Sequence, residues 1–248
     1  VHGLGDHTGC YTELADFLVS KGFKSYGLDL HGFGKSEGRR GHVNRIEDYI
    51  DDLKLLHTIT QQKNDLFRHK LIYGQSFGGL LVLAYLQKYP DDYTHAVISA
   101  PALNPARNVS RMLLFVSTVC NRIWPSIPFQ NKIKIEQITE DSDAQDTYRN
   151  DPYFHHTITP RLFEEMRRLS KSVWEYIRQF KKDLHILFIH GDADQVTDHH
   201  DTLSFFERIP VISKRLEIVP GMKHDPLTYR GGETVYKLLS DWFKSVGM

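Results

Sequence analysis

Residues 74–78, with the sequence Gly-Gln-Ser-Phe-Gly, constrain the fold of this chain more than any other feature. They follow the short apolar run at residues 69–73, which is typical of a strand. They precede the apolar run at residues 80–86, which is typical of a buried helix. A serine held between a strand and a helix needs a sharp, strained turn, and glycines two positions on either side allow close packing there. The segment therefore predicts that Ser76 is a nucleophile, with the N–H of Phe77 beside its oxygen.

A glycine-rich loop at the start of the chain supplies a second candidate N–H donor. Residues 1–5, with the sequence Val-His-Gly-Leu-Gly, are typical of a strand end that runs into such a loop. Reactions at an ester carbonyl create an oxyanion, which backbone N–H groups stabilise. We therefore expect the N–H groups of Leu4 and Phe77 to form an oxyanion hole.

Two later strand ends supply candidates for the acid and the base that activate such a serine. The apolar run at residues 215–219 leads through a Pro-Gly turn to His224. The apolar run at residues 184–189 is followed by several aspartates. The resulting chain order of serine, acid and histidine is that of the α/β-hydrolase triad and differs from the orders in chymotrypsin and subtilisin.

Three aspartates compete for the role of the acid. Asp192 lies very close to the end of its strand, and Asp198 is well placed to cap the helix expected from residue 199. Asp194 lies between them. For His224 the alternative is an ordinary surface histidine, because the chain contains 14 histidines. The pairs at residues 155–156 and 199–200 lack partners at metal-ligand spacing, so we expect no metal site.

Strand and helix patterns alternate along most of the chain. Strands are expected at residues 23–30, 69–73, 95–100, 184–189 and 215–219, and helices at residues 12–21, 44–63, 78–89, 199–208 and 233–245. Such alternation predicts an α/β fold, with a mostly parallel sheet covered by helices on both faces. The first residue already looks like the end of an interior strand, so we expect earlier strands to be absent from this sequence.

The alternation breaks once, between residues 102 and 182. No strand is evident there, and the segment ends in a helix with a regularly spaced apolar face. We expect this segment to be a helical cap inserted into a core of residues 1–101 and 183–248. Its most apolar part, residues 112–129, either packs the cap onto the core or lines an acyl tunnel or contacts a membrane, with Arg107, Arg111 and Arg122 close to anionic head groups.

These motifs together resemble the monoacylglycerol lipase and lysophospholipase branch of the α/β-hydrolases. The resemblance is carried, over nearly the whole chain, by residues 2–7, 29–38, 74–78, 191–194 and by His224. It implies a cofactor-free serine hydrolase that cleaves lipid esters of glycerol through an acyl-enzyme, beneath a lid-like cap.

The resemblance also suggests roles for individual residues. The family pattern Gly-x-x-Asp after the strand favours Asp194 as the acid. Tyr148 resembles a cap tyrosine that reaches the polar end of the substrate, and Gln75 stands where a histidine commonly precedes the nucleophile, so both are expected to contact substrate. The chain departs from the family at Cys10, where arginine is frequent, and at Thr197, where many members have cysteine.

Composition adds limits to this interpretation. The 248 residues, 40% of them hydrophobic, suffice for one catalytic domain with an insertion. Lys+Arg and Asp+Glu balance at 31 each, so we expect no nucleic acid partner. Two cysteines and no evident membrane span or signal peptide favour a cytoplasmic protein, peripheral to membranes if the cap binds lipid.

Two alternatives to a lipase stay open at this stage. A short-chain carboxylesterase or an acyltransferase would use the same triad and would differ in acyl length or in the acceptor of the acyl group. A non-catalytic binding module on the same fold is disfavoured, because such proteins usually lose a triad residue and here candidates for all three are present.

Overall fold

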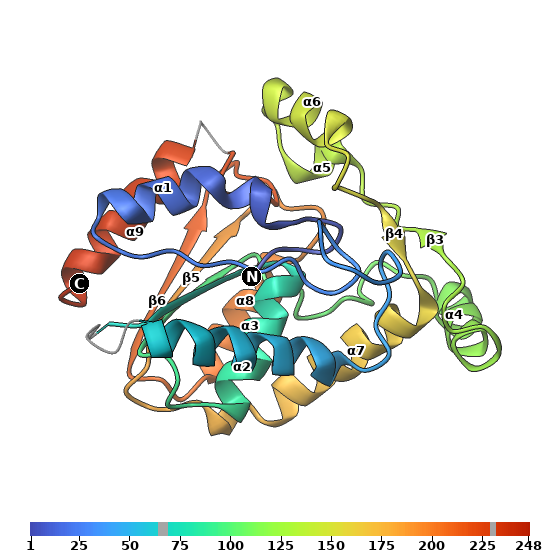
Figure 1. Ribbon diagram of the computed structural model, residues 1–248, viewed down its shortest axis with the longest axis horizontal. Coiled ribbons are helices and arrows are strands. Elements are labelled where there is room, and N and C mark those ends of the chain that lie inside the picture. The colour runs from blue at the N-terminus through green and yellow to red at the C-terminus, as the bar shows by residue number, and fades with distance from the viewer. Residues whose placement is uncertain (64–68, 229–231) are drawn as a thin grey trace.

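The computed structural model describes residues 1–63, 69–228 and 232–248. Within these, four parallel strands form one sheet in the order β1-β2-β5-β6 (Figure 1). Their bounds are β1 Leu71–Gln75, β2 His95–Ser99, β5 His185–Gly191 and β6 Ser213–Val219. Ile98 pairs with Gly74 on one side and Phe188 on the other, so the carboxyl ends of the strands lie at one edge of the sheet.

Helices cover both faces of this sheet, which confirms the predicted α/β architecture. One face is covered by α1 (Thr12–Ser20), which follows η1 (Thr8–Tyr11), and by α9 (Glu233–Ser245) (Figure 1). The other is covered by α2 (Ile46–Lys63), α3 (Phe77–Lys88), α7 (Pro160–Glu175) and α8 (His199–Arg208). In β5, Leu187 packs in the same cluster as Trp242 of α9, whereas its neighbour Phe188 packs with Phe205 of α8. This alternation is what a strand buried on both faces requires.

Helix α3 carries the nucleophile turn and is apolar on every side. Leu80, Leu81 and Leu83 are fully buried, as expected for a helix enclosed between a sheet and other helices. The helix ends before Tyr89, which has φ −130° and ψ 70°. Pro90 follows, and the residue before a proline is biased away from helical geometry.

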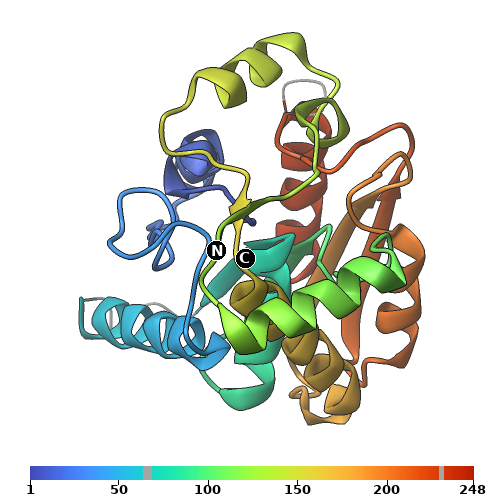
Figure 2. The same cartoon turned by 90° about the vertical axis from the view of Figure 1, so that its right-hand side faces the viewer.

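Only part of the segment predicted to be a cap lies apart from the core of the four-stranded sheet. It contains α4 (Arg111–Ile123), β3 (Phe129–Gln130), α5 (Ile135–Ile138), α6 (Ser142–Asn150) and β4 (Thr157–Ile158) (Figure 2). The expectation of no strand here was wrong, because β3 and β4 form a two-residue antiparallel pair, too short to leave a sequence signal. Helix α7 instead buries Leu162 and Val173 in the main core, and η2 (Ile177–Gln179) follows it. The division at residues 102 and 182 stays a prediction.

The predicted strand at residues 23–30 is wrong. These residues form no regular secondary structure and belong to no sheet within the described chain. The position beside β1 is taken by Val1, whose carbonyl accepts the N–H of Gln75 at 3.2 Å. The N–H of Leu30 donates to Nε2 of His2 at 3.0 Å rather than to a backbone carbonyl. A cavity of about 660 Å³ is lined both by residues 21–28 and by residues 69–73. Residues 23–30 therefore have no described strand at pairing distance on that side.

No helix among the described residues is long and apolar enough to cross a membrane.

Candidate active site

Ser76 occupies a strained turn between β1 and α3. Its φ of 54° and ψ of −118° lie in a region that side-chain-bearing residues rarely adopt, at a cost of about 1–3 kcal/mol. Hydrogen bonds hold the turn in place: the N–H of Ser76 donates to the carbonyl of Ser99 at 2.9 Å, and its carbonyl accepts from Ala102 at 3.0 Å. These hydrogen bonds to the core thus hold Ser76 in a backbone conformation that is unfavourable by itself.

The two flanking glycines are required by close backbone contacts. A Cβ atom on Gly74 would lie 2.6 Å from the carbonyl oxygen of Gly78. A Cβ atom on Gly78 would lie 2.3 Å from that of Val1 and 2.4 Å from that of His2. A larger residue at position 74 would therefore open the turn itself, and one at position 78 would displace residues 1–2 from it.

The two N–H groups predicted to form the oxyanion hole lie on either side of this turn. Leu4 and Ser76 line the same small cavity, and Phe77 is the first residue of α3, where N–H groups have no helical partner. Neither the N–H of Leu4 nor that of Phe77 donates to another group in the described part of the chain. Both donors are therefore available to a bound oxyanion.

Asp194 is the aspartate that the structure brings to His224. Nδ1 of His224 donates to Oδ2 of Asp194 at 2.7 Å, and both side chains are buried. The two competing aspartates are used elsewhere. Asp192 accepts the N–H of Gly221 at 2.6 Å, and Asp198 caps α8, as expected, by accepting the N–H of His200 at 2.9 Å.

The electrostatics of this pair favour an ion pair. Burial alone would raise the pKa of Asp194, but the charge of His224 and a hydrogen bond from His190 hold that pKa far below its usual range. Burial lowers the pKa of His224, but the carboxylate of Asp194, followed by Asp225 and Asp6, raises it above its usual value. The protonated ring of His224 is therefore stabilised by the neighbouring carboxylates.

A small cavity of about 40 Å³ brings the candidate residues together. Ser76, Leu4, Gln75, Tyr148 and His224 all line it. Within the described residues, Ser76 and His224 face this cavity without a direct hydrogen bond between them. The larger cavity beside residues 21–28 contains none of the three candidate triad residues, so it is not the site of this chemistry.

Two carboxylates that the sequence analysis did not single out lie at the polar end of this cavity: Asp6 lines it, and Asp225 contacts two of its lining residues. Asp225 accepts hydrogen bonds from the hydroxyl of Tyr148 at 2.8 Å and from the amide of Gln75 at 3.5 Å. Asp6 accepts from the hydroxyl of Tyr11 at 2.7 Å, and burial raises the pKa of Asp6. Asp225 adjoins His224 in sequence, but its role depends on a tyrosine 77 residues away.

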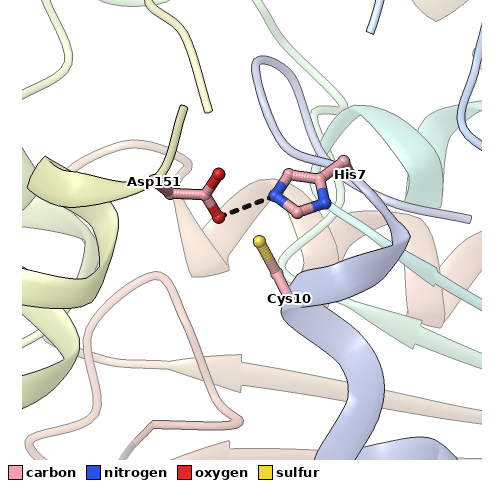
Figure 3. Close-up of side chains that lie close together, drawn as sticks. All are labelled: His7, Cys10 and Asp151. Carbon is pink, nitrogen blue, oxygen red and sulfur yellow. Dashed lines mark hydrogen bonds and ion pairs between the residues drawn. The ribbon is translucent and has the colours of Figure 1, made fainter. Parts of the chain in front are cut away.

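One cluster of possible metal ligands lies beside the site, where the first loop meets the segment predicted to be a cap. His7, Cys10 and Asp151 offer ligand atoms within 4.8 Å of one another (Figure 3). Nδ1 of His7 accepts the N–H of Gly9 at 3.1 Å, so the ring proton is on Nε2, which donates to Asp151 at 2.7 Å. A metal at Nε2 would need that proton removed and the other nitrogen protonated. The cluster fits a hydrogen-bonded link between loop and cap better than a metal site.

A second cluster, at the start of α8, is already neutralised by an arginine. Asp198, His199 and His200 lie within ligand distance of one another. Arg107 contacts Asp198 at 2.9 Å and Asp201 at 2.6 Å. The prediction that Arg107 meets anionic head groups was therefore wrong, because its charge is paired with the carboxylates of α8.

The parallel sheet, the helices on both of its faces and the strained serine turn after β1 define the α/β-hydrolase class. Within that class, the chain belongs to the family described as "Serine aminopeptidase, S33", whose profile matches residues 1–229.

Named relatives narrow the resemblance. A monoacylglycerol lipase of Mycolicibacterium smegmatis is 27% identical over 98% of this chain and 86% of its own length. The phospholipase YtpA of Bacillus subtilis is 22% identical over 96% of this chain and 90% of its own. The solved structure of a Paleococcus ferrophilus monoacylglycerol lipase superposes with a TM-score of 0.89, at 27% identity, over 99% of this chain and 92% of that one. The predicted resemblance to this branch is confirmed.

Proposed function

We propose that this protein is a serine hydrolase that cleaves carboxylic esters of lipids, monoacylglycerols in particular. The observation that carries the proposal is the 2.7 Å pair of His224 and Asp194 at the cavity that also exposes the strained Ser76. The similarity to monoacylglycerol lipases supports the substrate class.

The proposed chemistry has two halves. His224 removes the proton from Ser76 as its oxygen attacks the ester carbonyl, and Asp194 keeps the imidazole in the tautomer that can accept it. The C–O bond to glycerol then breaks, and His224 gives its proton to the departing alcohol oxygen. In the second half, His224 deprotonates a water that attacks the acyl-enzyme, which releases the fatty acid and returns the proton to Ser76.

The free N–H groups of Leu4 and Phe77 are the proposed oxyanion hole. Negative charge develops on the carbonyl oxygen only as the tetrahedral intermediate forms, so donors fixed there favour the transition state over the bound ester. A donor of this kind typically contributes about 3–4 kcal/mol. Both donors are backbone groups, so their position does not depend on side-chain rotamers.

The charges around the polar end favour an uncharged head group. Asp6 lines the cavity and Asp225 lies directly behind it, whereas no described lysine or arginine lines it. A phosphate would be desolvated next to these carboxylates without a compensating cation, which costs several kcal/mol. Glycerol hydroxyls can instead donate to a carboxylate or to the hydroxyl oxygen of Tyr148, whose own proton is donated to Asp225, and can accept from the amide of Gln75. Gln75 and Tyr148 are the proposed substrate contacts. This favours monoacylglycerols over lysophospholipids.

We further propose that residues 102–182 act as a cap and that α4 contacts the lipid surface. Met112, Phe115 and Ile123 are 77, 70 and 78% exposed and lie on one stripe of α4 at helical spacing. The opposite side of α4, with Leu114, Ser117 and Asn121, is less exposed. The helix is tied to α7 by the hydroxyl of Thr118, which donates to Glu164 at 3.2 Å. An exposed apolar stripe flanked by Arg111 and Arg122 suits the boundary of a membrane.

A substrate panel tests the proposal. Monoacylglycerols, lysophospholipids, a soluble butyrate ester and an aminoacyl anilide are offered to the wild-type protein and to Ser76→Ala. We expect the wild type to prefer long-chain monoacylglycerols and the variant to be inactive. Preference for the butyrate would indicate a carboxylesterase, acyl transfer to an added alcohol an acyltransferase, and cleavage of the anilide alone a peptidase.

A further inference from the structure

A second histidine is bound to the candidate catalytic acid. His190 lies in β5, is fully buried, and has its Nε2 atom 3.1 Å from Oδ2 of Asp194, the oxygen that also accepts from His224. Nδ1 of His190 lies 2.8 Å from the hydroxyl of Thr202 in α8. An ionised carboxylate can only accept, so Nε2 of His190 carries a proton and Nδ1 accepts from Thr202. Thr202 thus selects the tautomer that donates to Asp194.

The same carboxylate is constrained on every side. Its Oδ1 atom accepts the N–H groups of Val196 at 2.7 Å and Thr197 at 3.0 Å. Its Oδ2 atom accepts from the hydroxyl of Thr197 at 2.8 Å, in addition to the two histidines. Three donors therefore share one oxygen. Each one that stabilises the negative charge there leaves less of it to attract the proton of His224.

We propose that His190 is a positioning residue that fixes the carboxylate of Asp194 and limits its pull on His224. The inference rests on the proposed function, in which His224 must both accept a proton and release it to the departing alcohol. Without the His190 donor, Asp194 would stabilise protonated His224 more strongly, and the base would be blocked at higher pH. The other ionisable groups nearby are Asp6 and Asp225, which face His224, and His199, whose ring centroid is 6.3 Å from that of His190.

Two substitutions separate hydrogen bonding from packing. His190→Leu removes the donor, and His190→Gln keeps an N–H close to the position of Nε2. His95→Leu is the matched control, because His95 is also a buried strand histidine but lies at the amino end of its strand, away from the candidate site. The pH profile of kcat/KM on a monoacylglycerol and the NMR titration of the His224 ring are measured for each variant.

We expect kcat to fall about tenfold in His190→Leu, the effect of losing one hydrogen bond to a charged group. The acidic limb of the profile and the His224 titration should both move to higher pH. His190→Gln should restore most of both, and His95→Leu should lower Tm without moving either.

An unmoved His224 titration in His190→Leu, or equal losses in the Leu and Gln variants, would overturn the inference. If His190→Leu does not fold, Thr202→Val carries the test, because it removes the group that selects the tautomer; an unmoved limb there would also overturn it. A wild-type protein that hydrolyses no ester would contradict the proposed function instead, while the NMR titration would still decide the role of His190.

Discussion

Buried histidines lie at both ends of the parallel strands, at the carboxyl edge and at the amino edge of the sheet, and their pKa values are shifted in opposite directions. At the carboxyl edge, His224 faces Asp194, and that carboxylate raises its pKa. At the amino edge, the rings of His95 and His185 stack with centroids 4.7 Å apart, beside His69. Burial, helped by these two neighbours, lowers the pKa of His95 to about 4. A buried histidine becomes a candidate base only where a carboxylate accompanies it.

Contacts with the cap also distinguish the two edges. The N–H of Asp225 donates to the carbonyl of Ile138 in α5 at 2.8 Å, and the N–H of His155 donates to Gly5 at 2.9 Å. The loops that carry the candidate base and a proposed oxyanion donor are thus both hydrogen-bonded to the segment proposed as a cap. At the amino edge, His95 instead packs against Trp242 of α9. The carboxyl edge thus carries the groups proposed for catalysis, whereas the buried histidine at the amino edge contributes to packing.

The largest predicted effect tests the acid on which this contrast depends. Asp194→Asn should lower kcat about 10⁴-fold with near-normal folding, because the imidazole loses the partner that selects its tautomer. Asp192→Asn, which alters only the contact with Gly221, should be mild by comparison. Steady-state kinetics and circular dichroism on both variants make the comparison, and reversed results would mean that the wrong carboxylate was chosen.

The cap can be tested at its exposed stripe. Met112→Ser with Phe115→Ser should weaken binding to vesicles about tenfold to a hundredfold, since each buried apolar side chain contributes about 1.5–3 kcal/mol at most. Turnover of a soluble butyrate ester should not change. Ile212→Ser is the matched control, because Ile212 is 81% exposed but lies outside the cap. Equal losses on soluble and vesicle-bound substrates would reduce the stripe to a structural role.

The raised pKa of His224 predicts the pH profile. The base works only when neutral, so activity should be lost as pH falls, by about tenfold per pH unit below the limb. Because that pKa is raised above 6.5, the acidic limb of kcat/KM should lie above pH 6.5. A limb at or below pH 6.5 would mean that Asp194 does not stabilise the protonated ring.

The smallest predicted effect concerns the amino edge. The unfolded chain protonates His95 near pH 6.5, whereas the folded protein resists this until about pH 4. Stability should therefore fall as pH drops through this window. His95→Leu should remove about 2–4 °C of that fall in Tm, measured by calorimetry between pH 7 and pH 4.5. An unchanged slope would show that His95 is not what sensitises the fold to acid.

The parts of the site that lie within one local pattern could be predicted from sequence. The strand, turn and helix around Ser76 follow from adjacent residues, and so does the position of His224 after a strand. Residues whose roles come from distant partners could not be predicted. Asp225 depends on Tyr148, and His190 depends on Thr202 in the following helix.

The errors of sequence interpretation have the same origin. Residues 23–30 have the composition of a strand, but a strand also needs a neighbour at pairing distance, which no local pattern encodes. Arg107 was expected to meet lipid head groups, whereas the fold places it against two carboxylates of α8. In both cases the segment was interpreted without the neighbour that decides its structure.

Labelling with a fluorophosphonate probe tests the central claim most directly, because only an activated serine attacks phosphorus readily. The account predicts one modified residue, Ser76, identified by peptide mass spectrometry. It also predicts that labelling disappears in Ser76→Ala and slows strongly in Asp194→Asn. Labelling that persists unchanged in Ser76→Ala would contradict the account.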